Sequence, residues 1–360
     1  MQQIFRFKTL VFTTICASVL FLASCSEDEP MIDNSLNGFF IVNEGGFGNS
    51  NTSLSYFDEE NMTISNNVFQ AVNGRPLGDQ TQSMAIFEGE GFIQVQNSGK
   101  VEVIDVEDFT SLATIEDGIS SPRYFVGLNI SKGYVSDWGD GFSGSVKVID
   151  LDSYTVTKTI ETGAGANQML LVGEQLYVAN RGGFGTDNTV SIIDTNTDEV
   201  TSEITVGDNP IGLVQDAQGA LWVLSAGAFA FDAEFNLIVE ESTPSSLSKI
   251  SNNQVEFQLD FPEITFSNAG NLNINSAGNT LYFTYDGEVY RMSVSDTQLP
   301  ASGFVEQSLY GFAVDPENGQ LIGLQAPDFS AAGNMIFYDS EGNETASYAV
   351  GIGPNGCAFE

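Results

Sequence analysis

The 360-residue chain has no histidine and only three cysteines. Without histidine, nucleophile systems of the Ser-His-Asp or Cys-His type are excluded, as are His-ligated zinc, copper and haem sites. Cys16 lies in an N-terminal apolar segment, so Cys25 and Cys357 cannot build a disulfide framework within a fold. The chain also lacks a phosphate-binding loop, a dinucleotide-binding glycine fingerprint and an EF-hand loop. We therefore expect a protein that is not an enzyme and has no resident cofactor or metal.

Basic residues are scarce as well. There are 11 of them against 48 acidic residues, which gives a formal net charge of −37. Nucleic acid is excluded as a partner, because phosphate binding needs a basic face. A polyanionic ligand or an anionic membrane surface is disfavoured for the same reason. Such a charge is typical of solubility and self-repulsion at a cell surface, with cation binding as the alternative.

Residues 1–24 have the pattern of an export signal, in which basic residues precede an apolar stretch too short to span a membrane. Leu22-Ala23-Ser24-Cys25 resembles a lipobox, after which bacterial lipoproteins are cleaved and acylated on the new N-terminal cysteine. The resemblance implies lipidation of Cys25; a plain secretory signal is the alternative. Residues 25–36 would form an acidic tether. Its Ser-Glu-Asp-Glu resembles the signal of surface-exposed outer-membrane lipoproteins, although it could equally be a solvated linker.

A repeat follows the tether. Seven short apolar runs that end in a polar residue recur about every 45 residues, as in "VEVID" at 101–105 and "VSIID" at 190–194. Ser251 and Ser293 replace the terminal aspartate in the fifth and sixth runs. Each run belongs to a phrase of four alternating segments separated by Gly, Asn and Asp turns. Four strands in about 45 residues make one blade of a β-propeller. The sequence predicts an all-β, seven-bladed β-propeller that forms one domain over residues 37–360.

The two ends of this domain are complementary. "GFFIVNEG" at 38–45 matches the second strand of the phrase, as in "LYVANRG" at 176–182, so the first blade lacks its innermost strand. "GPNGCAFE" at 353–360 matches the opening strand of the phrase, "GDNPIGL" at 207–213. We predict that the C-terminal strand joins the first blade and closes the ring, which removes the exposed edges of an open array.

Residues 176–213 resemble the YncE-like, YVTN-type propeller repeat, and the likeness extends in weaker form over residues 37–360. This resemblance implies the fold, but it says little about function, because propellers host enzymes, ligand traps and scaffolds.

Function must be predicted from the loops. The loops before strand one and after strand two of every blade share one face. Five of the seven loops after strand two carry a phenylalanine near glycines, and the loops before strand one add amides and phenols such as Gln82. Apolar walls with a few placed hydrogen-bonding groups describe a small-molecule site. The predicted ligand-binding residues are Asn43, Phe47, Gln96, Asn97, Arg123, Tyr124, Asp137, Trp138, Phe142, Asn167, Gln168, Asn180, Arg181, Phe184, Phe229, Tyr285, Tyr310, Gln325 and Phe329.

Amide and phenol groups predominate in this set, which suits a large, polar, roughly neutral ligand and not a phosphate or a bare carboxylate. In the alternative interpretation, each phenylalanine fills the wedge between neighbouring blades. The sequence leaves open whether Asp137 and Asp140 hold Ca²⁺. The longest repeat interval, between Asp194 and Ser251, contains an insertion on the same face with three phenylalanines.

The combination of lipobox, acidic tether, propeller repeats and amide-aromatic mouth resembles surface lipoprotein propellers that bind cobalamin beside a TonB-dependent outer-membrane transporter. The resemblance implies capture of a corrinoid and its transfer to such a transporter. Two alternatives stay open. One is a non-enzymatic scaffold for a protein or glycan, and the other is a lactonase-like enzyme with a metal held near the axis by Asp and Asn.

Overall fold

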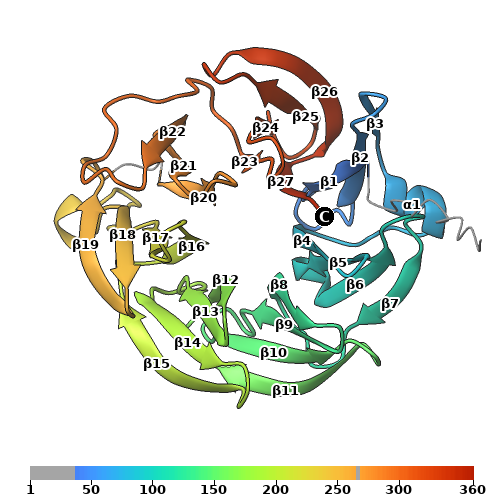
Figure 1. The fold of residues 1–360 in the computed structure, drawn as a ribbon, viewed down its shortest axis with the longest axis horizontal. Coiled ribbons are helices and arrows are strands. Elements are labelled where there is room, and N and C mark those ends of the chain that lie inside the picture. The colour runs from blue at the N-terminus through green and yellow to red at the C-terminus, as the bar shows by residue number, and fades with distance from the viewer. Residues whose placement is uncertain (1–36, 265–267) are drawn as a thin grey trace, which may run out of the picture. The chain divides into compact units, whose positions relative to one another are not determined.

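The computed structural model describes residues 37–264 and 268–360. These residues form seven antiparallel sheets arranged in a ring, which confirms the seven-bladed β-propeller (Figure 1). The predicted signal peptide of residues 1–24, the lipidation site at Cys25 and the tether of residues 25–36 lie outside the described residues.

Each blade is numbered in chain order, and its strands are given from the axis outward. Blade 1 contains β27 (Pro354–Ala358), β1 (Gly38–Asn43), β2 (Ser53–Asp58) and β3 (Thr63–Ser65), and blade 2 contains β4 (Thr81–Phe87), β5 (Glu90–Val95), β6 (Lys100–Asp105) and β7 (Ser111–Ile115). Blade 3 contains β8 (Pro122–Asn129), β9 (Lys132–Asp137), β10 (Ser145–Asp150) and β11 (Thr155–Glu161). Blade 4 contains β12 (Ala166–Val172), β13 (Gln175–Asn180), β14 (Thr189–Asp194) and β15 (Glu199–Thr205). Blade 5 contains β16 (Pro210–Gln215), β17 (Leu221–Ser225), β18 (Ser246–Ser251) and β19 (Gln254–Asp260). Blade 6 contains β20 (Gly270–Ile274), β21 (Thr280–Tyr285) and β22 (Glu288–Ser293), and blade 7 contains β23 (Gly311–Val314), β24 (Leu321–Gln325), β25 (Ala332–Tyr338) and β26 (Glu344–Ile352).

The C-terminal strand closes the ring as predicted. β27 pairs antiparallel with β1, with Phe40 opposite Ala358 and Ile41 opposite Cys357. Figure 1 shows the C-terminus beside the strands that begin the ring. The first blade is therefore assembled from both ends of the propeller, and β1 has a hydrogen-bonded neighbour on each side.

Blade 6, one short helix and two 3₁₀ turns depart from the repeat. Blade 6 has three strands in the part of the chain described. Where a fourth strand would pair with β22, there is only an isolated bridge between Val289 and Val305. A short helix, α1 (Val68–Asn73), lies between blades 1 and 2 and buries Val68 and Phe69. Short 3₁₀ turns occur at Gln96–Ser98 and Val239–Glu241.

The core lies between blades. The middle strands of a blade are covered on both faces, so β13 is almost wholly buried, whereas β15, the outermost strand of the same blade, is mostly exposed. Phe92 of blade 2 stacks on Phe125 of blade 3 with ring centroids 3.9 Å apart. Apolar residues from adjacent blades thus form a series of small cores around the ring, and no single central core is needed.

The repeated aspartate has a local structural role. At the end of the third strand, its carboxylate accepts a backbone N–H from the following turn, as Asp150 does from Ser153 and Asp194 from Asn196. Such Asx turns fix the hairpin to the outermost strand, which explains why an apolar run ending in Asp marks each regular blade.

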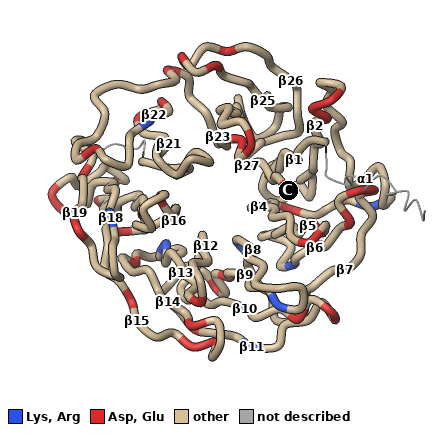
Figure 2. Tube along the Cα trace, viewed as in Figure 1, with Lys and Arg blue, Asp and Glu red and all other residues tan. Residues whose placement is uncertain are grey.

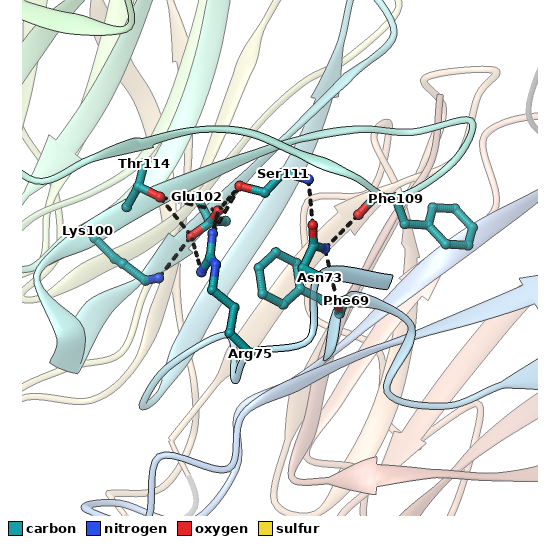
Figure 3. Close-up of polar contacts among 8 residues, drawn as sticks. All are labelled: Phe69, Asn73, Arg75, Lys100, Glu102, Phe109, Ser111 and Thr114. Atoms are coloured by element: carbon teal, nitrogen blue, oxygen red, sulfur yellow. Dashed lines mark hydrogen bonds and ion pairs between the residues drawn. The ribbon is translucent and has the colours of Figure 1, made fainter. Parts of the chain in front are cut away.

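One buried carboxylate ties blade 2 together. Glu102 has a fully buried side chain and forms ion pairs with Arg75 at 2.5 Å and Lys100 at 2.9 Å (Figure 3). It also accepts hydrogen bonds from the hydroxyls of Ser111 and Thr114. Burial raises the pKa of Glu102, but the hydrogen bonds from Arg75, Ser111 and Lys100 outweigh burial, so its pKa lies below the ordinary value.

Candidate functional site

A cavity of about 600 Å³ opens at the axis of the ring. Its lining comes from the innermost strands and from the loops before strand one and after strand two, which is the face predicted from the sequence. Side-chain amides dominate the lining, and apolar groups such as Val42, Met84 and Phe312 lie among them. The lining amides belong to Gln80, Gln82, Gln96, Asn167, Gln168, Asn268, Asn271, Asn273 and Asn355.

The charged groups of the lining are Glu44, Arg123 and Arg181. Arg123 is only 4% exposed, and its guanidinium lies 4.0 Å from the ring centroid of Trp138. The guanidinium of Arg181 lies 5.8 Å from the same ring. Both guanidiniums therefore make cation–π interactions with the Trp138 ring.

The carboxylate of Glu44 is held by neutral donors. The Tyr310 hydroxyl donates to Oε2 at 2.5 Å, and the Gln80 amide donates to Oε1 at 3.1 Å. Burial raises the pKa of Glu44, while the hydrogen bond from Tyr310 and the charge of Arg123 oppose that rise. Glu44 and Arg123 form no ion pair among the described residues, although both line the cavity.

Seven of the predicted residues line this cavity. They come from blades 2, 3, 4 and 7 and were identified from the loops before strand one or after strand two. They are Gln96, Arg123, Tyr124, Asn167, Gln168, Arg181 and Tyr310.

Three predicted residues lie inside their blades, one position in the sequence before the loop that follows strand two. Asn43, Asp137 and Asn180 are the last residues of β1, β9 and β13, and all three are fully buried. The amide of Asn180 donates to the Thr189 and Ser191 hydroxyls, and that of Asn43 donates to Ser55. These side chains brace their own blades, which corrects the expectation that they lie between the rings of the mouth.

Asp137 and Asp140 organise loop backbone. The Asp137 carboxylate accepts the backbone N–H groups of Ser120, Ser121 and Gly139. Asp140 accepts those of Phe142 and Ser143. The described residues contain no group of three or more His, Cys, Asp or Glu side chains that could hold a metal ion.

Strand alternation explains the one-residue offset. Successive side chains of a strand point to opposite faces, so when the last residue of strand two faces into the blade, the next one faces the mouth. Glu44 and Arg181 both follow such a residue and line the cavity. Glu44 was missed for this reason, although its position matches that of Arg181 in the repeat. Asn355 was missed because it lies within the innermost strand β27, whereas the predicted residues come from loops.

Three further predicted residues lie elsewhere. The Tyr285 hydroxyl contacts the backbone of Glu263, and its side chain lines a separate cavity of about 540 Å³ beside blade 6. The Asn97 amide donates to Asp79, and Gln325 lies at the end of β24 outside the central lining. None of the three belongs to the central cavity.

Four of the five loop phenylalanines are exposed on the cavity face. The exposed fractions are 72% for Phe47, 70% for Phe142, 71% for Phe184 and 46% for Phe329. The interpretation in which these rings fill wedges between blades is therefore wrong for these four. Phe229 is partly buried, with its ring 6.3 Å from that of Phe231 in the blade 5 insertion.

Neighbouring loops hold the exposed rings in place. The Phe184 ring lies 5.8 Å from Phe142 and 6.3 Å from Trp138, which makes an aromatic cluster across blades 3 and 4. The Phe184 N–H donates to the Gly141 carbonyl at 2.7 Å. Gly141 has a φ of +88°, and a Cβ there would lie 2.2 Å from the Phe184 ring. Glycine is therefore required at this position both for the backbone and for the ring.

A second pair of rings lies across the cavity mouth in blade 7. Tyr310 and Phe329 meet at 5.1 Å in an edge-to-face arrangement, and Tyr310 connects this pair to Glu44. The mouth thus combines an amide-lined hollow, two stacked cations and exposed rings on at least two sides.

The comparisons with known proteins identify the family. The family described as a domain of unknown function, DUF5074, matches residues 37–352. The chain belongs to this DUF5074 family. No curated protein matches the sequence of this DUF5074 member.

Solved structures share its fold. A quinonprotein alcohol dehydrogenase-like protein from Bacteroides thetaiotaomicron is 16% identical, with a TM-score of 0.63 over 90% of this chain and 78% of the other. The periplasmic gluconolactonase of Pseudomonas aeruginosa is 14% identical, with a TM-score of 0.62 over 89% and 98% of the two chains. A putative 6-phosphogluconolactonase from Bacteroides uniformis is 11% identical, with a TM-score of 0.64 over 90% and 100%. At these identities the likeness shows the propeller fold alone.

No helix among the described residues is both long and apolar enough to cross a membrane.

Proposed function

We propose that this protein captures a small molecule at the central mouth of the propeller. The observation that carries the proposal is the combination of an amide-lined axial cavity with solvent-exposed phenylalanine rings on the same face. Exposed apolar patches rimmed by polar residues are typical of surfaces that bind a ligand or a partner. Loops that interlock through Gly141 and Phe184 present the rings in fixed positions, so little order has to be created on binding.

A corrinoid such as cobalamin is the candidate ligand. It is large and edged with amides, so it offers donors and acceptors to a lining rich in Gln and Asn. A molecule of that size does not fit whole into about 600 Å³. It would lie across the mouth, with its edge groups reaching the lining amides and its apolar surface against the Phe142–Phe184 cluster.

The second part of the proposal concerns where the protein acts. The lipobox-like Leu22–Cys25 and the acidic tether would hold the propeller by a lipid on the outer surface of the outer membrane. There it would pass the ligand to a TonB-dependent transporter. The net charge of −37 is consistent with attachment by the lipid and not by the propeller surface.

The second candidate function is an interaction scaffold. The blade 5 insertion exposes Phe235 by 85% and Phe231 by 44% on the cavity face. Exposed aromatic groups of this kind are also typical of protein–protein contacts. In that case a macromolecule covers the rings, and small ligands leave the melting temperature unchanged.

Calorimetric titration of the purified protein with cyanocobalamin tests the proposal. We expect one-to-one binding that Phe184→Ala weakens roughly tenfold, because the variant loses the area buried under the ring together with about 0.5–1.5 kcal/mol from the aromatic contact itself. Ile130→Ala is the matched control, since Ile130 is 74% exposed in the turn between β8 and β9 on the opposite face. Absence of binding, or equal losses in the two variants, would rule out corrinoid capture at this mouth.

A further inference from the structure

The charge of the central cavity is opposite to that of the molecule. The chain has 48 acidic and 11 basic residues, yet the cavity lining includes two arginines and a single carboxylate. Figure 2 shows acidic residues distributed over the blades and their outer turns. Arg123 and Arg181 therefore form a local cationic site inside a strongly anionic protein.

Arg123 is buried with neutral partners only. Its Nε donates to the Asn167 side-chain oxygen at 3.3 Å, and its Nη1 donates to that of Gln96. None of the ion pairs among the described residues includes it. A guanidinium has five N–H donors, and Nη2 of Arg123 donates to no described residue. Burial lowers the pKa of Arg123, the charge of Arg181 lowers it further, and the charge of Glu44 only partly opposes these effects, so that the pKa is about 9.

Arg181 is placed beside the same aromatic platform. Its guanidinium lies over Trp138, and its side chain makes no hydrogen bond or ion pair within the described residues. The position is fixed by the backbone, because the Arg181 N–H donates to the Gly165 carbonyl at 2.9 Å. Two guanidiniums that share one indole and retain free N–H donors match the forked geometry with which arginine binds oxyanions.

We propose that Arg123 and Arg181 form an oxyanion-binding subsite that holds a carboxylate or phosphate group of the ligand. This rests on the proposed function, since it assigns an anchor within the same mouth, and it replaces the sequence-based expectation of a ligand without such a group. The burial of Arg123 strengthens its attraction for an anion, because charges interact more strongly away from bulk water. A larger molecule that carries such an anionic group can also contact the rings.

The tests use inorganic phosphate, pyrophosphate and citrate as probes, with glucose as a neutral control. Binding is followed by calorimetry and by tryptophan fluorescence. Trp138 touches both arginines, whereas the other tryptophan, Trp222, is fully buried in blade 5. We expect saturable binding of at least one anion and none of glucose. Preference for phosphate and pyrophosphate over citrate, or the reverse, identifies which oxyanion the subsite takes.

Three variants test which side chains bind the anion. Arg181→Gln weakens anion binding roughly tenfold or more, because a hydrogen bond to a charged group is stronger than one to a neutral group. Arg291→Gln makes the same charge change on the outer strand β22 and leaves affinity within about twofold, since exposed remote charges are screened. Glu44→Gln tightens binding, because it removes the carboxylate of the lining. Arg181 is the main target because Arg123 also braces Gln96 and Asn167.

No saturable anion binding, or equal effects of Arg181→Gln and Arg291→Gln, overturns the subsite. The cyanocobalamin titration separates this failure from that of the proposed function. If cyanocobalamin binds equally to the wild type and to Arg181→Gln, capture stands and the subsite is wrong. If anions bind through Arg181 while cyanocobalamin does not bind, the subsite stands and the corrinoid is wrong.

Discussion

Replacement of Glu102 by glutamine is expected to destabilise the propeller strongly. The Glu102 side chain is fully buried and forms ion pairs with Lys100, whose side chain is only 11% exposed, and with Arg75, which is 39% exposed (Figure 3). Breaking a buried ion pair by removing one partner costs about 3–5 kcal/mol. Glutamine keeps one acceptor oxygen, and Arg75 can turn to solvent, so we expect a loss of about 2–3 kcal/mol for Glu102→Gln.

The assay is urea or thermal unfolding at pH 7, with Glu199→Gln as the control. Glu199 lies exposed at the start of β15, where the same chemical change should cost less than about 0.5 kcal/mol.

The contribution of Glu102 to the stability depends on pH with a definite sign. Because the pKa of Glu102 is lowered in the folded state, its contribution is present above the unfolded pKa and disappears as pH falls through the folded value. The difference in the free energy of unfolding between the wild type and Glu102→Gln should therefore become smaller as the pH falls. Equal stabilities of the two variants at pH 7 would refute this account of the cluster.

Two further predictions concern ring closure and the rim. Deletion of residues 354–360 removes β27, which leaves β1 with an open edge; we expect insolubility or a melting temperature lowered by at least about 10 °C, whereas deletion of Glu360 alone should change little. A normally folded truncation would contradict closure by β27. Gly141→Ala forces a Cβ against the Phe184 ring at a positive φ, so ligand affinity should fall together with about 1 kcal/mol of stability. Unchanged affinity in calorimetry would show that the Phe184 ring does not contact the ligand.

Most of the fold could be predicted from the sequence, because period-2 patterning, Asx turns and the complementary ends are local signals. Asp150 and Asp194 mark regular blades since each caps its own hairpin. Blade 6 could not be predicted in the same way. A single bridge at Val305 stands where its fourth strand would pair, and Ser293 at the end of β22 does not predict this, because blade 5 has Ser251 at the same position and keeps four strands.

The candidate site was predictable to the level of loops but not of individual side chains. Whether the last residue of strand two or the next one faces the axis depends on where each strand ends, which sequence patterns define only within a residue or two. Asn43 was therefore predicted in place of Glu44, while Arg181 was predicted together with the buried Asn180. The pairing of Trp138 with two arginines joins residues of the neighbouring blades 3 and 4 that are far apart in the sequence, so no local pattern predicts it.

Hydrogen–deuterium exchange of the protein, free and saturated with cyanocobalamin, tests most directly whether the central mouth is the capture site. The account predicts slower exchange in the loops 137–144 and 180–188, which carry the Phe142–Phe184 cluster. The turns 151–154 and 195–198 lie at the opposite ends of the same two blades and should exchange at unchanged rates. Protection of those turns instead, or no protection in either set, would contradict capture at the central mouth.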